Sequence, residues 1–263
     1  MKTGFQFNGR KNASNKNKPL VSIITSTFNA AAYLPKAIES IQALDYENFE
    51  WIIIDGCSKD KTVDLIQQHE EIIKYWISEP DFGIYDAWNK GLRVATGEWI
   101  CFLGADDLIM PNSISEMLEV QRLSEENLDF IYGRVELYKN NKFLRTIGIP
   151  WSWSKFKHYF SVTHPCALHN ASYFKRYGEF DTSFKITGDY EMLLRAGSNL
   201  KVGFVDTVVA KMQMGGLSNA NSKVFQEALR ARLVHNLTTP ILGTIHAKWS
   251  EIKWRVRRIV FGI

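Results

Sequence analysis

Apolar residues between positions 20 and 104 recur in two alternating periods. Short continuous apolar runs predict buried strands, and the segments between them, with apolar residues three or four positions apart, predict helices. The strand-like runs cover 20–26, 50–55, 73–78 and 98–104, and the helical segments cover 31–44, 60–69 and 84–97. Because strands alternate with helices, this part of the chain predicts βαβ units and a mostly parallel sheet flanked by helices.

The rest of the chain predicts further elements in a less regular order. Helical spacing occurs at 112–123, 171–177 and 189–196, and strand-like patterns occur at 128–138 and 200–209. From residue 221 onward the pattern predicts two helices that are broken near Pro240. We therefore predict a disordered basic tail at 1–18, one α/β domain at 19–215 and a C-terminal helical extension at 216–263.

Charge is spread unevenly along the chain. The net charge is +4, but residues 1–18 carry +5 and residues 248–263 carry +4, which leaves −5 for residues 19–247. An acidic body lacks the basic face that releases counterions from a phosphate backbone, so no nucleic-acid partner is expected. The basic ends are consistent with binding to anionic lipid or with a role only in keeping the chain soluble. Three cysteines without a C-x-x-C spacing predict a reducing compartment. With no signal-peptide or membrane-spanning pattern, we expect a cytoplasmic protein.

Polar residues follow each of the first four predicted strands. The strand ends deliver Ser26, Thr27, Phe28 and Asn29, then Asp55, then Asp81, then Asp106 and Asp107. Ligands of open α/β sheets bind at the carboxyl ends of the strands, so these side chains are candidates for a binding site. Adjacent carboxylates need a cation or ordered donors, and oxygen-only ligands favour Mg²⁺ or Mn²⁺. The alternative is an Asp-rich turn before the next helix.

Four motifs along the chain resemble those of the family 2 glycosyltransferases. They are VSIITSTFN, IIDGCSKDKT, the segment from SEPDFGIYDAW to GADD, and GDYEMLLR, and together they cover about residues 19–210. The resemblance implies a GT-A fold, which is a Rossmann-like, mostly parallel sheet, here followed by C-terminal helices. It also implies an inverting enzyme that moves a sugar from a nucleotide-sugar donor, most often a UDP-sugar, to a saccharide or lipid-linked saccharide acceptor in surface polysaccharide or lipid-linked oligosaccharide synthesis.

The resemblance assigns donor-binding residues one position at a time. Ser26 to Asn29 look like the P-T-Y-N element of the first strand, with Phe28 in the place of the aromatic residue near the nucleobase. Asp55 looks like the first acid of the D-D-G-S turn, and Gly56 replaces the second. Asp81 resembles the acid beside the nucleoside.

The same resemblance assigns the metal site and the base. Asp106 and Asp107 resemble the D-x-D element that holds Mn²⁺ or Mg²⁺ and the donor diphosphate, with Gly104 replacing its first acid. Asp189 resembles the general base, with Gly188 in the place of the acid that often precedes it. A residue at the start of a helix can also serve as a cap, and this alternative stays open beside the catalytic one.

Two further side chains are candidates for the acceptor side. His164 lies before the apolar run 165–168, and Glu191 follows Asp189 by two positions. A lone histidine is usually structural, and neither D-x-H spacing nor a second histidine four positions away points to a metal.

The C-terminal helix carries an apolar stripe with basic flanks. The stripe contains Trp249, Ile252, Val256, Ile259, Val260 and Ile263. Two interpretations remain open: residues 246–263 contact the inner face of a membrane peripherally, or the stripe packs on the domain itself. For the chain as a whole, the alternative to an enzyme is a non-catalytic nucleotide-binding or scaffold protein derived from one.

Overall fold

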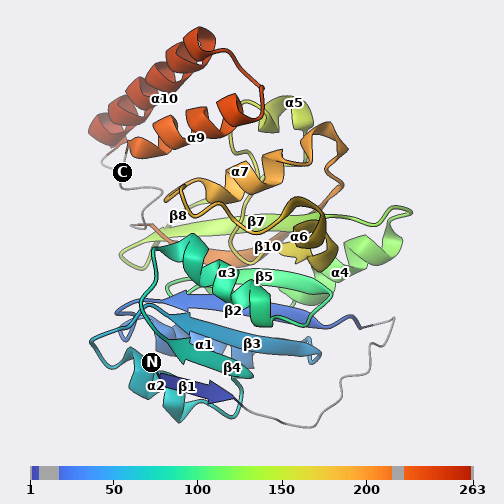
Figure 1. Ribbon diagram of the computed structural model, residues 1–263, viewed down its shortest axis with the longest axis vertical. Coiled ribbons are helices and arrows are strands. Elements are labelled where there is room, and N and C mark those ends of the chain that lie inside the picture. Colours follow the sequence, from blue (N-terminus) through green and yellow to red (C-terminus); the bar gives the residue numbers. More distant parts are fainter. Residues whose placement is uncertain (1, 6–17, 215–221, 262–263) are drawn as a thin grey trace.

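The computed structural model describes residues 2–5, 18–214 and 222–261. Its centre is one sheet with strand order β1-β4-β3-β2-β5-β9-β7-β10-β6, and β8 pairs with β7 at the side (Figure 1). The four strands that the apolar runs predicted, β2 Val21–Thr27, β3 Phe49–Asp55, β4 Tyr75–Ser78 and β5 Trp99–Gly104, are parallel neighbours. The α/β class with a mostly parallel sheet is confirmed.

The remaining strands extend this sheet beyond β5. They are β6 Leu108–Ile109, β7 Phe130–Lys139, β8 Lys142–Ile147, β9 Leu168–Asn170 and β10 Val202–Gln213. β9 is antiparallel to both β5 and β7, whereas β10 runs parallel to β7. In the apolar run 165–168, only Leu168 belongs to a strand, and it follows a turn in which Cys166 has a positive φ of 59°.

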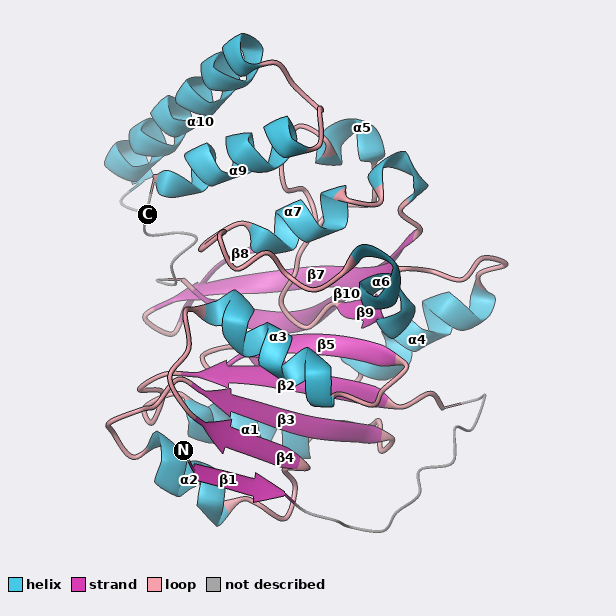
Figure 2. Cartoon of the chain, in the orientation of Figure 1, coloured by secondary structure: helices cyan, strands magenta, loops and turns pink. Residues whose placement is uncertain are grey.

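Helices cover both faces of the sheet, as Figure 2 shows. They are α1 Leu34–Gln42, α2 Thr62–Gln68, α3 Ile84–Val94, α4 Ser113–Leu123, α5 Trp153–Phe156, α6 Ala171–Tyr177 and α7 Gly188–Leu194, with a 3₁₀ turn at Gly197–Asn199. Successive strand residues point to opposite faces. Ile23 belongs to the cluster with α1, α2 and α4, and Ile24 to the cluster with α3, α6 and α7. Burial on both faces explains the continuous apolar runs.

The N-terminal segment corrects one expectation. Residues 1–18 were predicted to be disordered, but Lys2–Phe5 form β1, which pairs antiparallel with β4. Residues 1 and 6–17 lie outside the described part. An edge strand offers unpaired N–H and C=O groups to any extended segment. A segment with few large apolar side chains can therefore still pair with β4 through its backbone. Gly4 also fits because a Cβ there would lie 2.0 Å from Nε1 of Trp76.

The C-terminal region forms two helices, α9 Lys223–Val234 and α10 Pro240–Phe261. α9 packs on α7, and α10 packs on α9 (Figure 1). Gly243 makes this second contact close, since a Cβ there would lie 2.4 Å from Cδ1 of Leu229. Among the described residues, no helix combines the length and the apolar character needed to cross a membrane.

Candidate active site

The parallel strands β2 to β5 bring their polar ends to one edge of the sheet. The register pairs Thr27 with Asp55, Asp55 with Ser78, and Ser26 with Gly104. The segments that follow, with the candidates for donor and metal binding, therefore start side by side (Figure 1). This is the edge at which open α/β sheets bind their ligands.

Asp55 lies fully buried beneath this edge. Its carboxylate accepts hydrogen bonds from Oγ1 of Thr27 at 2.8 Å, Oγ of Ser78 at 2.6 Å, and both N and Oγ of Ser58. A buried carboxylate with this many donors is well satisfied and holds their segments together. Asp55 therefore fixes the ends of β2 and β4 relative to each other. A direct role in donor binding stays a prediction.

The turn after β2 presents an aromatic side chain to solvent. Asn29 has a positive φ of 49°, its N–H donates to Oγ of Ser58, and its Oδ1 accepts from N of Lys59. These bonds tie the turn after β2 to the turn after β3. Phe28, on the same turn, is 67% exposed. An anchored turn with an open aromatic face suits stacking on a flat ring.

Gly56 lies between Phe28 and Asp81. A Cβ at position 56 would be 2.5 Å from Oδ2 of Asp81 and 3.4 Å from Cδ2 of Phe28. The carboxylate of Asp81 thus occupies the space that a larger residue 56 would need, and its Oδ1 accepts from N of Gly83. The position of the Asp81 carboxylate is a steric reason why glycine, and not a second acid, follows Asp55 in this turn.

The two adjacent carboxylates after β5 meet beside another glycine. A Cβ at Gly104 would lie 2.8 Å from Oδ2 of Asp107 and 3.1 Å from Oδ1 of Asp106. Burial raises the pKa of Asp106, and burial together with the charge of Asp106 raises the pKa of Asp107 well above its usual value. Two carboxylates that share a space and are each disfavoured in the charged form by burial favour a cation there.

The donor set fits a hard divalent cation without forming a complete cage. Within the described ranges, no group of three or more His, Cys, Asp or Glu side chains is arranged to hold a metal ion. Mg²⁺ is typically bound by one or two carboxylates together with substrate phosphates. Asp106 and Asp107 therefore match the kind of site in which a nucleotide completes the coordination.

Asp189 lies in the first turn of α7 and contacts α3. Its Oδ1 is 3.2 Å from the hydroxyl of Tyr85 and accepts the N–H of Tyr190 at 2.9 Å. Burial raises the pKa of Asp189 to about 6. The N-cap position of α7 belongs to Thr187, so the capping alternative is reduced to the single bond from Tyr190. A carboxyl group with this pKa is suited to accept a proton near neutral pH.

The segment before Asp189 is connected to the donor side of the sheet edge. Nζ of Lys185 donates to the carbonyl of Phe82 at 2.9 Å, directly beside Asp81. Gly188 allows Tyr85 to approach, because a Cβ at position 188 would be 2.8 Å from Cε2 of the Tyr85 ring. The segment of Asp189 therefore contacts the donor side at two places: Lys185 bonds to Phe82 in the loop 79–83, which we call the donor loop, and Gly188 packs against Tyr85 of α3.

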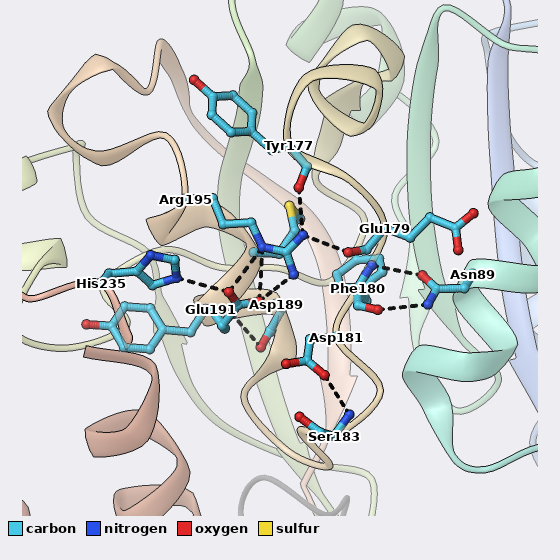
Figure 3. Close-up of polar contacts among 12 residues, drawn as sticks. Asn89, Tyr177, Glu179, Phe180, Asp181, Ser183, Asp189, Glu191, Arg195 and His235 are labelled. Atoms are coloured by element: carbon cyan, nitrogen blue, oxygen red, sulfur yellow. Dashed lines mark hydrogen bonds and ion pairs between the residues drawn. The ribbon is translucent and has the colours of Figure 1, made fainter. Parts of the chain in front are cut away.

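The structure does not bring the two acceptor-side candidates to an acceptor-facing surface. His164 is 5% exposed, stacks on Trp88, and its Nε2 lies 3.1 Å from Nε2 of His169. Burial lowers the pKa of His164 to about 3, so the ring is neutral. Glu191 is also buried, between Arg195 and His235, as Figure 3 shows. Both side chains are held in the interior by other residues.

Two residues that contact the segment of Asp189 were not predicted from the sequence. Tyr85 occupies an apolar position of a helical pattern, and Glu227 occupies a polar position of a surface helix, so neither stands out by type. A signal for Tyr85 lies in its closeness to Asp81 in the segment SEPDFGIYDAW. Glu227 accepts hydrogen bonds from the backbone N–H groups of Ile186 and Thr187, about 40 residues earlier in the chain. No local sequence pattern identifies such a contact.

The chain matches known proteins over most of its length. The model of the family "Glycosyl transferase family 2" matches residues 22–179. A PGL/p-HBAD biosynthesis glycosyltransferase of Mycobacterium bovis is 30% identical over 215 residues, which cover 76% of this chain and 80% of that protein. An uncharacterised glycosyltransferase of Rickettsia typhi is 30% identical over 255 residues, with 90% and 80% covered.

Solved structures share the fold at low sequence identity. Residues 1–349 of TarS from S. aureus, in complex with UDP-GlcNAc, superpose with a TM-score of 0.65 at 18% identity, and the match covers 92% of this chain and 73% of that one. The mannosyltransferase PcManGT from Pyrobaculum calidifontis, in complex with GDP-Man and Mn²⁺, gives a TM-score of 0.64 at 15% identity, with 92% and 75% covered.

Proposed function

The chain belongs to glycosyl transferase family 2, and on that premise we propose that it transfers a sugar with inversion from a UDP-sugar to an acceptor hydroxyl. The observation that carries the proposal is the contact between the donor loop and the segment of Asp189, made by Lys185 and Phe82. The joined elements offer an exposed aromatic ring, a carboxylate beside it and a second carboxylate with a raised pKa. A saccharide or lipid-linked saccharide in surface polysaccharide synthesis is the acceptor we expect.

The donor half would hold the nucleotide through Phe28 and Asp81, with the diphosphate next to Asp106 and Asp107. TarS, whose structure contains UDP-GlcNAc, shares this fold and supports a UDP-sugar. PcManGT was solved with Mn²⁺, which supports Mn²⁺ or Mg²⁺ at Asp106 and Asp107. A divalent cation bound there would supply positive charge against the leaving diphosphate.

The base half would act on the acceptor. Asp189, ionised above its pKa of about 6, accepts the proton of the acceptor hydroxyl as that oxygen attacks the anomeric carbon from the side opposite the leaving group. An alcohol is a poor nucleophile until a base within hydrogen-bond reach takes its proton. The raised pKa makes Asp189 a stronger base than an ordinary aspartate.

Donor binding with and without metal tests the proposal. Calorimetric titration of the purified chain with UDP should show binding in the presence of Mn²⁺ that EDTA largely abolishes. The matched variants are Asp106→Asn and Asp107→Asn, which keep the side-chain size and remove the charge. Equal UDP affinity with and without metal would contradict the metal assignment, and no turnover with any UDP-, GDP- or dTDP-sugar would contradict the enzyme.

We further infer that α10 holds the enzyme at the cytoplasmic face of an anionic membrane. One side of α10 is an exposed apolar stripe, whose members are between 51% and 75% exposed: Ile241, Ile245, Trp249, Ile252 and Val256. The other side packs on α9, with Ala247 buried and Trp254 edge-on to Phe225. Packing on the domain thus uses a different face from the stripe. The side chains of Ile259 and Val260, and residue Ile263, lie outside the described part.

Charge supports a lipid surface as the partner of this stripe. Residues 248–263 carry +4, and Nζ of Lys253 lies 5.2 Å from the centre of the Trp249 ring. A basic residue near an anionic membrane contributes about 1 kcal/mol, and an apolar helix face inserts between the headgroups.

Vesicle sedimentation tests the membrane assignment. The full chain should sediment with vesicles containing anionic lipid and stay in solution with neutral ones. The triple variant Ile245→Gln, Trp249→Gln, Ile252→Gln keeps the α9-facing side and should stay in solution with both. If the full chain ignores anionic vesicles and forms dimers that the triple variant lacks, a second copy covers the stripe and the membrane proposal is wrong.

A further inference from the structure

Three consecutive backbone N–H groups converge on one carboxylate from a distant helix. N of Lys185, Ile186 and Thr187 lie 3.1, 2.8 and 3.1 Å from Oε2 of Glu227, and Oε1 is also 3.1 Å from N of Lys185. Glu227 belongs to α9, about 40 residues further along the chain. These three N–H groups lead directly into the first turn of α7, which contains Asp189.

Among the described residues, the segment that enters α7 has no local side chain that accepts hydrogen bonds from its backbone N–H groups. The first N–H groups of a helix and of the chain entering it lack partners within the helix. Thr187, at the N-cap, makes no side-chain capping bond, and its buried Oγ1 has no hydrogen-bond partner in the described structure. Glu227 therefore supplies the acceptor for the N–H groups of residues 185–187 at the entry to α7, and its negative charge suits the positive end of the helix.

Ile186 transmits this restraint to the base. Its N–H donates to Glu227 at 2.8 Å, and its carbonyl accepts the hydroxyl of Tyr85 at 2.9 Å. The same hydroxyl lies 3.2 Å from Oδ1 of Asp189. A tyrosine hydroxyl has one hydrogen to donate, so the carbonyl of Ile186 competes with Asp189 for it. This competition leaves the Asp189 carboxylate incompletely satisfied and open to another proton donor.

We propose that Glu227 is a positioning residue for glycosyl transfer: by holding the backbone of residues 185–187 it fixes the distance and the hydrogen-bond competition between Tyr85 and Asp189. The inference rests on the proposed role of Asp189 as the base. It adds α9, which lies outside the matched range 22–179, to the catalytic machinery.

Other contacts of α9, and of His235 directly after it, hold neighbouring segments but do not reach Asp189. Arg230 lies 4.2 Å from the centre of the Phe184 ring and donates to Ser183. His235 contacts Glu191, next to Arg195, as Figure 3 shows. Glu227 alone among these three accepts hydrogen bonds from the backbone N–H groups of residues 185–187.

The charges around Asp189 come from three elements. Tyr85 faces it from α3 and Glu227 from α9, while Glu191 on α7 is paired with Arg195 and hydrogen-bonded to His235. Nζ of Lys185 is occupied by the carbonyls of Phe82 and Thr182. Burial is the main cause of the raised pKa of Asp189, and the charge of Glu227 raises it further.

Two substitutions of Glu227 separate its role as a hydrogen-bond acceptor from the effect of its negative charge. Glu227→Gln keeps an oxygen that can accept at the position of Oε2 but removes the charge, whereas Glu227→Ala removes both. Gln226→Ala, at a neighbouring position of α9, is the matched control. The measurements are kcat, KM for the donor, UDP affinity and melting temperature, with kcat determined from about pH 5 to pH 9.

Glu227→Ala should lower kcat by about tenfold to a hundredfold, the scale of a displaced reacting group, with UDP affinity unchanged. Glu227→Gln should keep kcat at pH 8 within about threefold, and the acid limb of its pH profile should move to lower pH because a negative charge near Asp189 is gone. Gln226→Ala should match the wild type in every measurement.

The outcomes distinguish this inference from the proposed function. If Glu227→Gln leaves the pH profile unmoved and Glu227→Ala loses melting temperature without a specific loss of kcat, Glu227 is only structural and the inference is overturned. If Glu227→Ala does not fold, the pH profile of Glu227→Gln decides. Full transfer by Asp189→Asn would instead contradict the base assignment, on which the inference rests.

Discussion

The donor side and the base side of the site are built in different ways. On the donor side, Asp55, Ser58 and Ser78 join the ends of neighbouring parallel strands, and strand pairing already places them together. On the base side, Tyr85, Ile186 and Glu227 come from three helices or loops up to about 140 residues apart in sequence. The first arrangement follows from the sheet, whereas the second depends on how separate helices pack over it.

Glycine has the same function on both sides. Gly56 leaves room for the Asp81 carboxylate, and Gly188 leaves room for the Tyr85 ring. Each stands where the resemblance led us to expect an acid, and each missing side chain is replaced in space by a site residue from another segment. The two departures from the family pattern are thus linked to side chains to which the proposed function assigns a role, and substituting the two glycines should separate donor binding from transfer.

The largest expected effect comes from Asp189→Asn, which changes only the base side of the site. Transfer should fall by about 10²-fold or more, the scale of a lost general base, while UDP affinity stays the same. The pKa of about 6 lies above the value of about 3.9 for an unfolded chain. Ionised Asp189 therefore costs stability, and this cost shrinks as pH falls below about 6 and is gone below about 3.9. At pH 8 the melting temperature of Asp189→Asn should thus be at least that of the wild type. Near-normal transfer would show that Asp189 serves only the helix.

Gly188→Ala should weaken the base side less severely. The new Cβ would contact the buried ring of Tyr85 at 2.8 Å, so the ring or the first turn of α7 must shift. We expect kcat to fall about tenfold and the protein to lose roughly 1–3 kcal/mol of stability from overpacking, with UDP affinity intact. Steady-state kinetics and thermal melting measure both. A change in UDP affinity instead of kcat would break the division between the two sides.

Gly56→Ala is the counterpart on the donor side. The Cβ would force the Asp81 carboxylate away from Phe28, from a starting distance of 2.5 Å to Oδ2. Weakening one charged hydrogen bond costs about 1.5 kcal/mol, the low end for such bonds, so UDP affinity should drop by about tenfold. Because the displaced atoms end a side chain, the melting temperature should hardly change. Calorimetry gives the affinity, and an unchanged kcat at saturating donor serves as the internal control.

The smallest effect is the pH dependence of the wild type. With the pKa of Asp189 at about 6, half of the base is protonated at that pH, so kcat should be about half of its value at pH 8. UDP affinity measured with saturating Mn²⁺ should vary less over the same range. A kcat that stays constant down to pH 5 would place the base elsewhere.

Much of the donor side could be predicted from the sequence, because it depends on local pattern. Continuous apolar runs identify β2 to β5, and parallel strands place their ends at one edge. The same reasoning predicts that Phe28, Asp81, Asp106 and Asp107 lie in one region. It does not reveal that Asp55 is fully enclosed by Thr27, Ser58 and Ser78, since enclosure depends on which hydroxyls meet across strands.

The α/β class, the succession of the first four strands and the identity of the carboxylates follow from the amino-acid sequence alone, because they depend on the period of apolar residues and on motifs confined to single segments. Tertiary packing was needed to show that Tyr85 and Glu227 contact the segment of Asp189, that His164 and Glu191 are enclosed, and that residues 2–5 form an edge strand. Each of these depends on a contact between segments far apart in the chain, and the apolar period that reveals a helix or a strand does not show which distant residue it meets.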